Sequence, residues 1–162
     1  MVDPTGEFGA RALRIYLHDV ESSYYGRPPT DAEIDEELRV NPSRLLAPPE
    51  GFFLVAQIGD EILGCIGLRL LPAGLGEVKR VFVVPRMRGQ GLGSRLMDAM
   101  EARARQHGVT RLRLDTRSDL VAARRLYTRH GFVEIPRFND DQVSEHWFGK
   151  VLEPEQPEPN GP

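Results

Sequence analysis

A strand that runs into a glycine-rich loop and then into a helix carries the clearest chemistry in this sequence. The run V-F-V-V-P-R-M-R-G-Q-G-L-G-S covers residues 81–94, with glycine at positions 89, 91 and 93. Glycine lets the backbone adopt positive φ and approach a ligand closely. The unpaired N–H groups and the positive dipole end of a helix that begins there favour an anion such as a diphosphate. Arg86 and Arg88 add positive charge and Ser94 adds a hydroxyl, so we expect an anion site.

Other interpretations of this loop fit less well. A Walker loop ends in Gly-Lys-Ser/Thr, whereas Gly93 is followed by Ser94 and Arg95. A dinucleotide-binding fingerprint needs Gly or Ala at position 94 and normally lies in the first βαβ unit, although Asp115 lies at a suitable distance for a ribose contact. A glycine-rich turn without a ligand would not explain three glycines and two arginines at one helix start.

The run R-G-Q-G-L-G at 88–93 resembles the R/Q-x-x-G-x-G/A signature of the GCN5-related N-acetyltransferases (the GNAT family), which bind the diphosphate of acetyl-CoA there. The resemblance extends through E-V-K-R-V-F-V-V-P at 77–85, L-R-L-D-T at 112–116 and A-R-R-L-Y-T-R-H-G-F at 123–132. It implies an α/β fold with a mixed central β-sheet of seven strands and helices on both faces. Its fourth and fifth strands, at 77–84 and 112–116, would splay apart to take acetyl-pantetheine.

The resemblance also implies which residues bind acetyl-CoA (coenzyme A) as co-substrate. The pantetheine arm would pair with the backbone of Phe82, Val83 and Val84. The diphosphate would contact the loop and the helix start, formed by Arg86, Arg88, Gly89, Gln90, Gly91, Leu92, Gly93 and Ser94. Leu120 stands where many family members carry a cofactor-binding Asn, so that contact is either absent or replaced by Ser118 or Arg124.

Acyl transfer from a thioester to an amine needs a neutral amine, a donor for the developing oxyanion and a proton for the leaving thiolate. By resemblance, Tyr127 matches the tyrosine that protonates the CoA sulfur; the alternative is an interior aromatic residue. Backbone N–H groups at 81–83 would polarise the thioester oxygen if the strand is bulged, as it is in the family.

Two residues are candidates for the general base. Glu77 matches a position that often carries a catalytic carboxylate, and the alternative is a surface charge paired with Lys79 or Arg80. An amine with a pKa near ~10 is only about 0.1% neutral at pH 7, so an acceptor for its proton is useful. His146 is the second candidate, with a structural histidine as its alternative.

Candidate substrate contacts lie in separate segments. Tyr25 lies between the first two expected helices, and Arg69 lies on the expected hairpin. Asn139 and Asp140 belong to a polar loop that could close over the acceptor and hold its cation; a solvated loop is the alternative. His146 on the last expected strand completes this set. One cysteine and four scattered histidines give no metal-site spacing, so we expect no metal.

Hydrophobic periodicity predicts the elements that position these residues. We expect four helices, at 9–22, 31–40, 91–107 and 119–130. The second begins with the capping-box pattern Thr30 to Glu33. Strands are expected at 52–57, 62–70, 77–84, 112–116, 132–135 and 146–151, the first two forming a hairpin. Residues 1–7 hold no convincing strand.

The length of 162 residues fits one domain, expected at 1–152, followed by a disordered acidic, proline-rich tail at 153–162. The net charge of −3 gives no global positive field, so neither nucleic acid nor a membrane surface is an expected partner. Cys65 lies in an apolar run and is expected to be buried. No apolar run approaches the ~18 residues of a membrane span, and no signal-peptide pattern occurs, so a cytoplasmic location is expected. The sequence leaves open whether the protein forms a homodimer.

These observations lead to one hypothesis with two alternatives. The hypothesis is an acyl-CoA-dependent N-acetyltransferase that transfers the acetyl group to a primary amine of a small molecule by direct attack on the thioester. The first alternative keeps the chemistry but takes a protein lysine or N-terminus, which needs an open groove near 138–141. The second is a non-catalytic acetyl-CoA sensor, against which the presence of Tyr127 and Glu77 counts.

Overall fold

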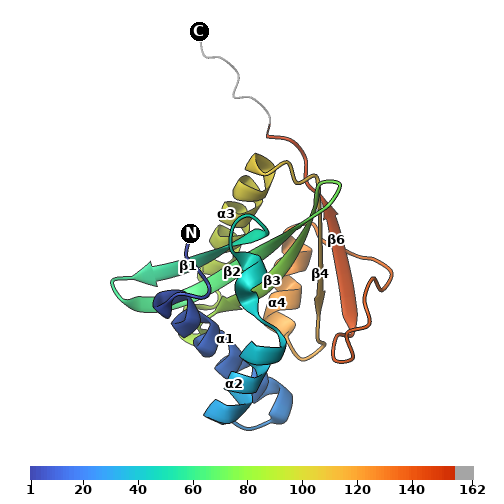
Figure 1. The fold of residues 1–162 in the computed structure, drawn as a ribbon. Helices are drawn as coiled ribbons and strands as arrows, with labels where there is room; N and C mark the ends of the chain where they lie inside the picture. The colour runs from blue at the N-terminus through green and yellow to red at the C-terminus, as the bar shows by residue number, and fades with distance from the viewer. Residues whose placement is uncertain (156–162) are drawn as a thin grey trace.

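A single mixed sheet organises the protein, whose computed structural model describes residues 1–155 (Figure 1). Its strands are β1 (Gly51–Ile58), β2 (Glu61–Leu71), β3 (Leu75–Val83), β4 (Arg111–Thr116), β5 (Val133–Glu134) and β6 (His146–Val151). They lie in the order β1-β2-β3-β4-β6-β5, and only β3 and β4 pair in parallel. The expected α/β fold with a mixed sheet is confirmed.

The seven strands implied by the family resemblance are not reached, because the described residues form six. The segment before the first helix makes no strand. Its backbone touches the sheet edge through one hydrogen bond, from Val2 N–H to the carbonyl of Phe53 at 2.8 Å. The expected tail at 153–162 lies mostly outside the described residues.

The helices begin and end where local chemistry requires. They are α1 (Glu7–Tyr25), α2 (Asp31–Val40), α3 (Leu92–Gln106) and α4 (Val121–Arg129), with short 3-10 helices at Ser43–Leu46 and Pro85–Met87. Thr30 caps α2 in the expected capping box with Glu33. Helix α1 continues three residues beyond the expected end because Gly26, with φ of 67°, is the first residue to leave the helical conformation.

Two hydrophobic cores lie on opposite faces of the sheet because strand side chains alternate in direction. Phe52 and Ile66 pack with α3 and α4 on one face. Phe53 and Cys65 pack with α1 on the other. Complete burial of a large apolar side chain of this kind stabilises the fold by roughly 1.5–3 kcal/mol. The helices therefore cover both faces, as Figure 1 shows.

Strands β3 and β4 separate soon after they meet. Only three residue pairs join them, from Leu75 opposite Arg111 to Glu77 opposite Arg113. Beyond Glu77, β3 has no neighbour on that side within the sheet. The splayed strands that the family resemblance implies are thus present, and side chains from both faces can reach the gap.

A β-bulge in β3 lies beside this gap. Cys65 is opposite Phe82 and Gly67 is opposite Lys79, so β3 advances three residues while β2 advances two. Arg80 takes up the difference with φ of 59°, a conformation that costs a residue with a side chain roughly 1–2 kcal/mol. Contacts hold it there: its guanidinium donates to the carbonyl of Asn41 at 2.9 Å and lies 5.6 Å from the ring centre of Tyr16.

The only cysteine is expected to be inert toward disulfide reagents in the native protein. Burial raises the pKa of the Cys65 thiol to about 12, so only about one thiol in ten thousand is ionised at pH 8. Incubation with a chromogenic disulfide should give no colour until a denaturant is added, and then one equivalent. Stoichiometric reaction of the native protein would contradict the buried position of Cys65.

Within the described residues, every helix is too short or too polar to cross a bilayer.

Candidate active site

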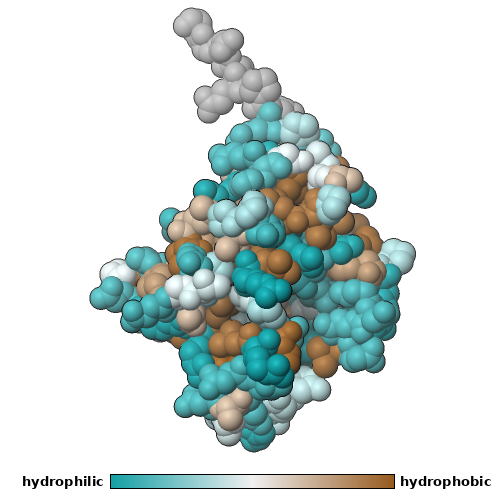
Figure 2. Space-filling view, viewed as in Figure 1, coloured by the Kyte–Doolittle hydropathy of each residue, from teal (hydrophilic) through white to brown (hydrophobic). Residues whose placement is uncertain are grey.

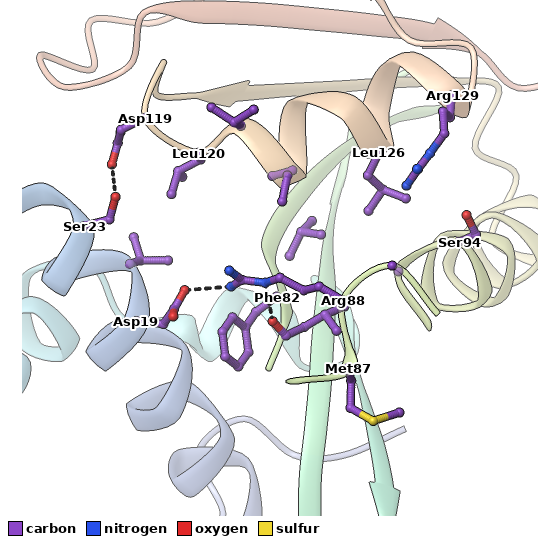
Figure 3. A pocket seen from close by; sticks show the side chains of 18 of the residues that line it. Asp19, Ser23, Phe82, Met87, Arg88, Ser94, Asp119, Leu120, Leu126 and Arg129 are labelled. Atoms are coloured by element: carbon purple, nitrogen blue, oxygen red, sulfur yellow. Dashed lines mark hydrogen bonds and ion pairs between the residues drawn. The ribbon is translucent and has the colours of Figure 1, made fainter. Parts of the chain in front are cut away.

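A cavity of about 850 Å³ lies against the part of β3 that has separated from β4 (Figure 3). Its walls come from α1, β3, the glycine-rich loop, the start of α3, and α4. Because α1 and α4 cover opposite faces of the sheet, only the separation of the two strands lets them line one space. Among the residues expected to bind the cofactor, seven line this cavity, namely Phe82, Val83, Arg88, Gly89, Gly91, Gly93 and Ser94.

The glycine-rich loop has the geometry of an anion site. Gly89 and Gly91 adopt φ of 75° and 83°, and a Cβ on either would meet nothing within 4 Å, so the loop needs glycine there for backbone conformation. Gly93 is needed for packing instead, because its Cβ would lie 3.1 Å from a methyl group of Leu126.

The start of α3 leaves donors for an anion. No side chain caps the helix at Gly91. Within residues 1–155, the N–H groups of Leu92, Gly93 and Ser94 have no hydrogen-bond partner, and Gly93 and Ser94 line the cavity. Three unpaired donors at a helix N-terminus fit a diphosphate.

The two arginines of the loop are tied to the protein. Arg88 donates from Nε to the carbonyl of Val83 and from Nη2 to Asp19 on α1, each at 2.9 Å (Figure 3). Arg86 pairs with Glu61 at the start of β2 and does not line the cavity. Four other expected cofactor contacts also lie outside its lining: Val84, Gln90, Leu92 and Arg124. The Nη1 of Arg124 donates to the carbonyl of Ser118 at 3.3 Å.

Arg129 is a cavity residue that the sequence did not single out. It lines the cavity from α4, one turn after Leu126, and its side chain points into the space beside Ser94 (Figure 3). Within residues 1–155 it makes no ion pair. The helical spacing of Leu126 and Arg129, three residues apart on one face, is the signal that could have found it.

A second cavity, of about 180 Å³, joins the first. Val20, Val81, Leu120 and Ala123 line both, so the two spaces meet at the bulged part of β3. In Figure 2 the surface seen from this side is hollowed between the helices at the bottom of the view and the side of β4 and β6. The smaller cavity lies under α1 and α2 and includes Tyr127.

Tyr127 is an interior aromatic residue that also borders a cavity. Its ring is buried, 5% exposed, and packs 5.9 Å from the ring centre of Phe132 and 6.1 Å from that of Phe148. It also lines the smaller cavity. Burial raises the pKa of the phenol, and Tyr16 and Asp115 raise it further, so the hydroxyl keeps its proton at neutral pH.

Glu77 lies away from both cavities, at the point where β3 and β4 part. Its carboxylate oxygens lie 2.8 Å from Lys79 Nζ and 2.9 Å from Arg113 Nη2. Burial raises the pKa of Glu77, but Lys79 and Arg113 outweigh burial, and the net shift is downward. Pairing with Lys79, the structural alternative for this residue, is what the structure shows; the pairing with Arg80 is absent within residues 1–155.

Glu77→Gln is expected to lower the stability at pH 7 by about 1–3 kcal/mol, since the buried side chain loses its charged interactions with the half-buried Lys79 and Arg113. In the wild type the pKa of Glu77 is lowered, so the Glu77 carboxylate stabilises the folded protein at neutral pH. This stabilisation is lost as the pH falls below the ordinary carboxyl range. The difference in melting temperature between wild type and variant should therefore shrink between pH 7 and pH 3.

Glu61→Gln is the control for that measurement, because Glu61 forms an exposed ion pair with Arg86. An exposed pair contributes about 0–1 kcal/mol. A loss for Glu77→Gln no larger than for Glu61→Gln would contradict the structural role.

The expected substrate contacts lie outside both cavities. Tyr25 ends α1, exposed, with Arg27 4.9 Å from its ring centre. Arg69 lies in β2 opposite Glu77. Asn139 accepts a hydrogen bond from Trp147 Nε1 at 3.0 Å, and Asp140 is exposed beside it. None of these four lines a cavity.

His146 is engaged through both ring nitrogens. Nε2 lies 2.9 Å from Ser118 Oγ, and Nδ1 lies 2.9 Å from Glu134 Oε1. It lines neither cavity. The polar loop does reach the smaller cavity, one to four residues beyond the predicted pair, through Asp141, Val143 and Ser144.

Comparisons with known proteins agree with this geometry. Residues 14–132 match the acetyltransferase (GNAT) family. An IAA acetyltransferase of Azospirillum brasilense is 38% identical over 90 residues, 55% of this chain and 59% of the relative. An aminoalkylphosphonate N-acetyltransferase of Salmonella typhimurium is 33% identical over 92 residues, 54% of this chain and 60% of the relative. The chain thus matches less than two thirds of the length of either.

The fold of a solved structure is also similar. PaiA N-acetyltransferase of Thermoplasma acidophilum, in complex with coenzyme A, superposes with a TM-score of 0.68 over 90% of this chain and 91% of its own, at 19% identity. The matched family segment begins inside α1 and ends just after α4, and so contains the walls of the larger cavity. The chain belongs to the GNAT family of acyl-CoA-dependent acetyltransferases.

Proposed function

We propose that this protein transfers the acetyl group of acetyl-CoA to a primary amine of a small molecule. The observation that carries the proposal is the junction of two cavities at Val81 and Ala123. One cavity has unpaired helix N–H groups suited to a diphosphate, and the other holds the protonated phenol of Tyr127. A thioester at the junction would lie between a cofactor site and an acceptor site.

The cofactor would be bound mainly by backbone groups. The N–H groups of Leu92, Gly93 and Ser94 would hold the diphosphate. Because the guanidinium of Arg88 is bonded to Asp19, Arg129 would supply the positive charge beside the diphosphate. Beyond Glu77, the edge of β3 that faces β4 has no partner strand and could pair with the amide groups of pantetheine.

The chemistry is acyl transfer by direct attack. A neutral amine attacks the thioester carbon, a carbon–nitrogen bond forms and the carbon–sulfur bond breaks. Val81 follows the bulge at Arg80 and lines both cavities, and a backbone N–H group of this segment would stabilise the oxyanion. Tyr127 would donate its proton to the departing sulfur. Glu77, held by Lys79 and Arg113, positions the strands and is not our candidate for the base.

A small acceptor is favoured by the second cavity. Its volume of about 180 Å³ lies among α1, α2 and the loop at 141–144. The two relatives described above are named for small acceptors, IAA and aminoalkylphosphonates. Acetylation of a protein lysine would need an open groove in the same place.

An amine panel tests the proposal. Purified protein, acetyl-CoA and small primary amines, with a lysine-containing peptide included, are assayed for thiol release and by mass spectrometry for the acetylated product. We expect release of CoA with at least one small amine and a faster reaction than with the peptide. A faster reaction with the peptide would favour the protein acetyltransferase, and binding of acetyl-CoA without transfer to any acceptor would favour the sensor.

A further inference from the structure

One carboxylate in the smaller cavity has no partner. Glu21 lies on α1 near its C-terminal end, half-buried, and lines this cavity together with Tyr127. Within residues 1–155 its side chain makes no hydrogen bond and no ion pair. A half-buried carboxylate without a partner is costly for the folded protein, which points to a role in binding or chemistry.

The other carboxylates of the cavity are occupied. Asp115 accepts a hydrogen bond from Ser144 Oγ at 2.6 Å and lies 3.6 Å from Lys79 Nζ. Glu37 accepts from the amide of Asn41 at 2.7 Å. Asp141 accepts from backbone N–H groups at 2.8 and 2.9 Å. Each of these three carboxylates therefore accepts at least one hydrogen bond.

The charged groups around Glu21 come from every element that packs on this part of α1. Glu33 and Glu37 belong to α2, Arg80 to β3, and Arg117 follows β4. Neither cation is bonded to Glu21, because Arg80 donates to the carbonyl of Asn41 and Arg117 to Asp119 and to the carbonyl of Val20. Burial raises the pKa of Glu21, Glu37 raises it further, and Arg117 and Arg80 oppose them; the net shift is upward.

We propose that Glu21 is the general base of the reaction, receiving the proton of the acceptor ammonium directly or through one water molecule in the cavity it shares with Tyr127. This inference rests on the proposed function. The ammonium nitrogen gives one proton to the Glu21 carboxylate, which passes it to solvent. The neutral nitrogen then forms the bond to the acetyl carbon. As the carbon–sulfur bond breaks, Tyr127 gives its proton to the sulfur, which leaves as the thiol of CoA, and the second proton of the nitrogen restores the phenol of Tyr127.

The test is the pH dependence of kcat/KM for two panel amines whose own pKa values differ by about two units. If the enzyme takes the ammonium and Glu21 deprotonates it, kcat/KM of the wild type rises to a plateau at one pH midpoint for both amines, because the midpoint belongs to the enzyme. In Glu21→Gln the midpoint should follow the pKa of each amine. The kcat/KM of Glu21→Gln should be about 100-fold below the wild-type value at pH 7, and it should approach the wild-type value at high pH.

Two further variants make the assignment specific. Glu37→Gln removes a negative charge that raises the pKa of Glu21, so its midpoint should move to lower pH. Glu36→Gln, on an exposed part of α2 and paired with Arg39, should keep the wild-type profile.

The outcomes separate this inference from the proposed function. A wild-type midpoint that follows the amine would overturn the role of Glu21. An unchanged pH profile in Glu21→Gln would also overturn it. If that variant raised KM and left the pH profile unchanged, Glu21 would bind the cation without accepting its proton. If the wild type acetylates no amine at all, both the acetyltransferase proposal and the role of Glu21 fail.

Discussion

Tyr127→Phe is expected to lower kcat for acetyl transfer by about 100-fold or more, with little change in the affinity for acetyl-CoA. A positioned general acid typically contributes 10²–10⁴-fold, and phenylalanine cannot supply the proton. The ring packing on Phe132 and Phe148 is retained, and within residues 1–155 the hydroxyl has no hydrogen-bond partner to lose. The melting temperature should therefore change little. Steady-state kinetics and calorimetric titration with acetyl-CoA measure the two effects separately.

The pH dependence provides a second check on the same residue. Because burial raises the pKa of Tyr127, the phenol stays protonated through and above its ordinary range near ~10. No loss of wild-type activity from its ionisation is expected below that range. Tyr24→Phe is the control, since Tyr24 is exposed and lines neither cavity. Unaltered turnover in Tyr127→Phe would remove the phenol from the mechanism.

Gly91→Asp is expected to weaken acetyl-CoA binding about 100-fold relative to Gly91→Asn. Both side chains tolerate positive φ better than other residues do, and a Cβ at this position meets nothing within 4 Å, so both variants should fold. They differ only in charge. A carboxylate about 4 Å from a diphosphate oxygen at an effective dielectric of about 20 is repelled by ~4 kcal/mol, of which salt and relaxation remove a part.

The control for Gly91→Asp is an aspartate placed at another glycine with positive φ, away from the expected cofactor site. Gly59, in the β1–β2 turn, has φ of 56° and an equally open Cβ position, so Gly59→Asp should bind acetyl-CoA as the wild type does. Titration calorimetry at two salt concentrations would show whether the effect is electrostatic. Equal affinities for Gly91→Asp and Gly91→Asn would mean that the diphosphate does not lie at the start of α3.

Both predictions combine local features with features that appear only when distant segments meet. The glycine-rich loop is local: three glycines, a preceding strand and a following helix are adjacent in the sequence, and their backbone preferences alone place free N–H groups at a helix start. The hairpin of β1 and β2 and the capping box of α2 are local for the same reason. The family signature added the splayed strands.

The sequence says least about side chains whose partners are distant in the sequence. Glu77 could not be distinguished from a general base by its position, because Arg113, which holds it, is 36 residues away. Arg88 lines the larger cavity, as a phosphate ligand would, but its guanidinium also bonds Asp19, 69 residues earlier. Ion pairs of this kind depend on how the elements pack, and neither composition nor periodicity encodes that packing.

The sequence by itself determined the order of helices and strands, the glycine-rich loop at the start of α3 and the tyrosine on α4, because each depends on residues within one or two helical turns. Only the tertiary structure decided which carboxylate is free. The separation of β3 and β4 lets α1 and α4 line one space from opposite faces of the sheet. Within residues 1–155, the other carboxylates of the smaller cavity have partners, whereas Glu21, in the same cavity as Tyr127, has none. A free partner is a property of the whole packed arrangement, so no local pattern can reveal it.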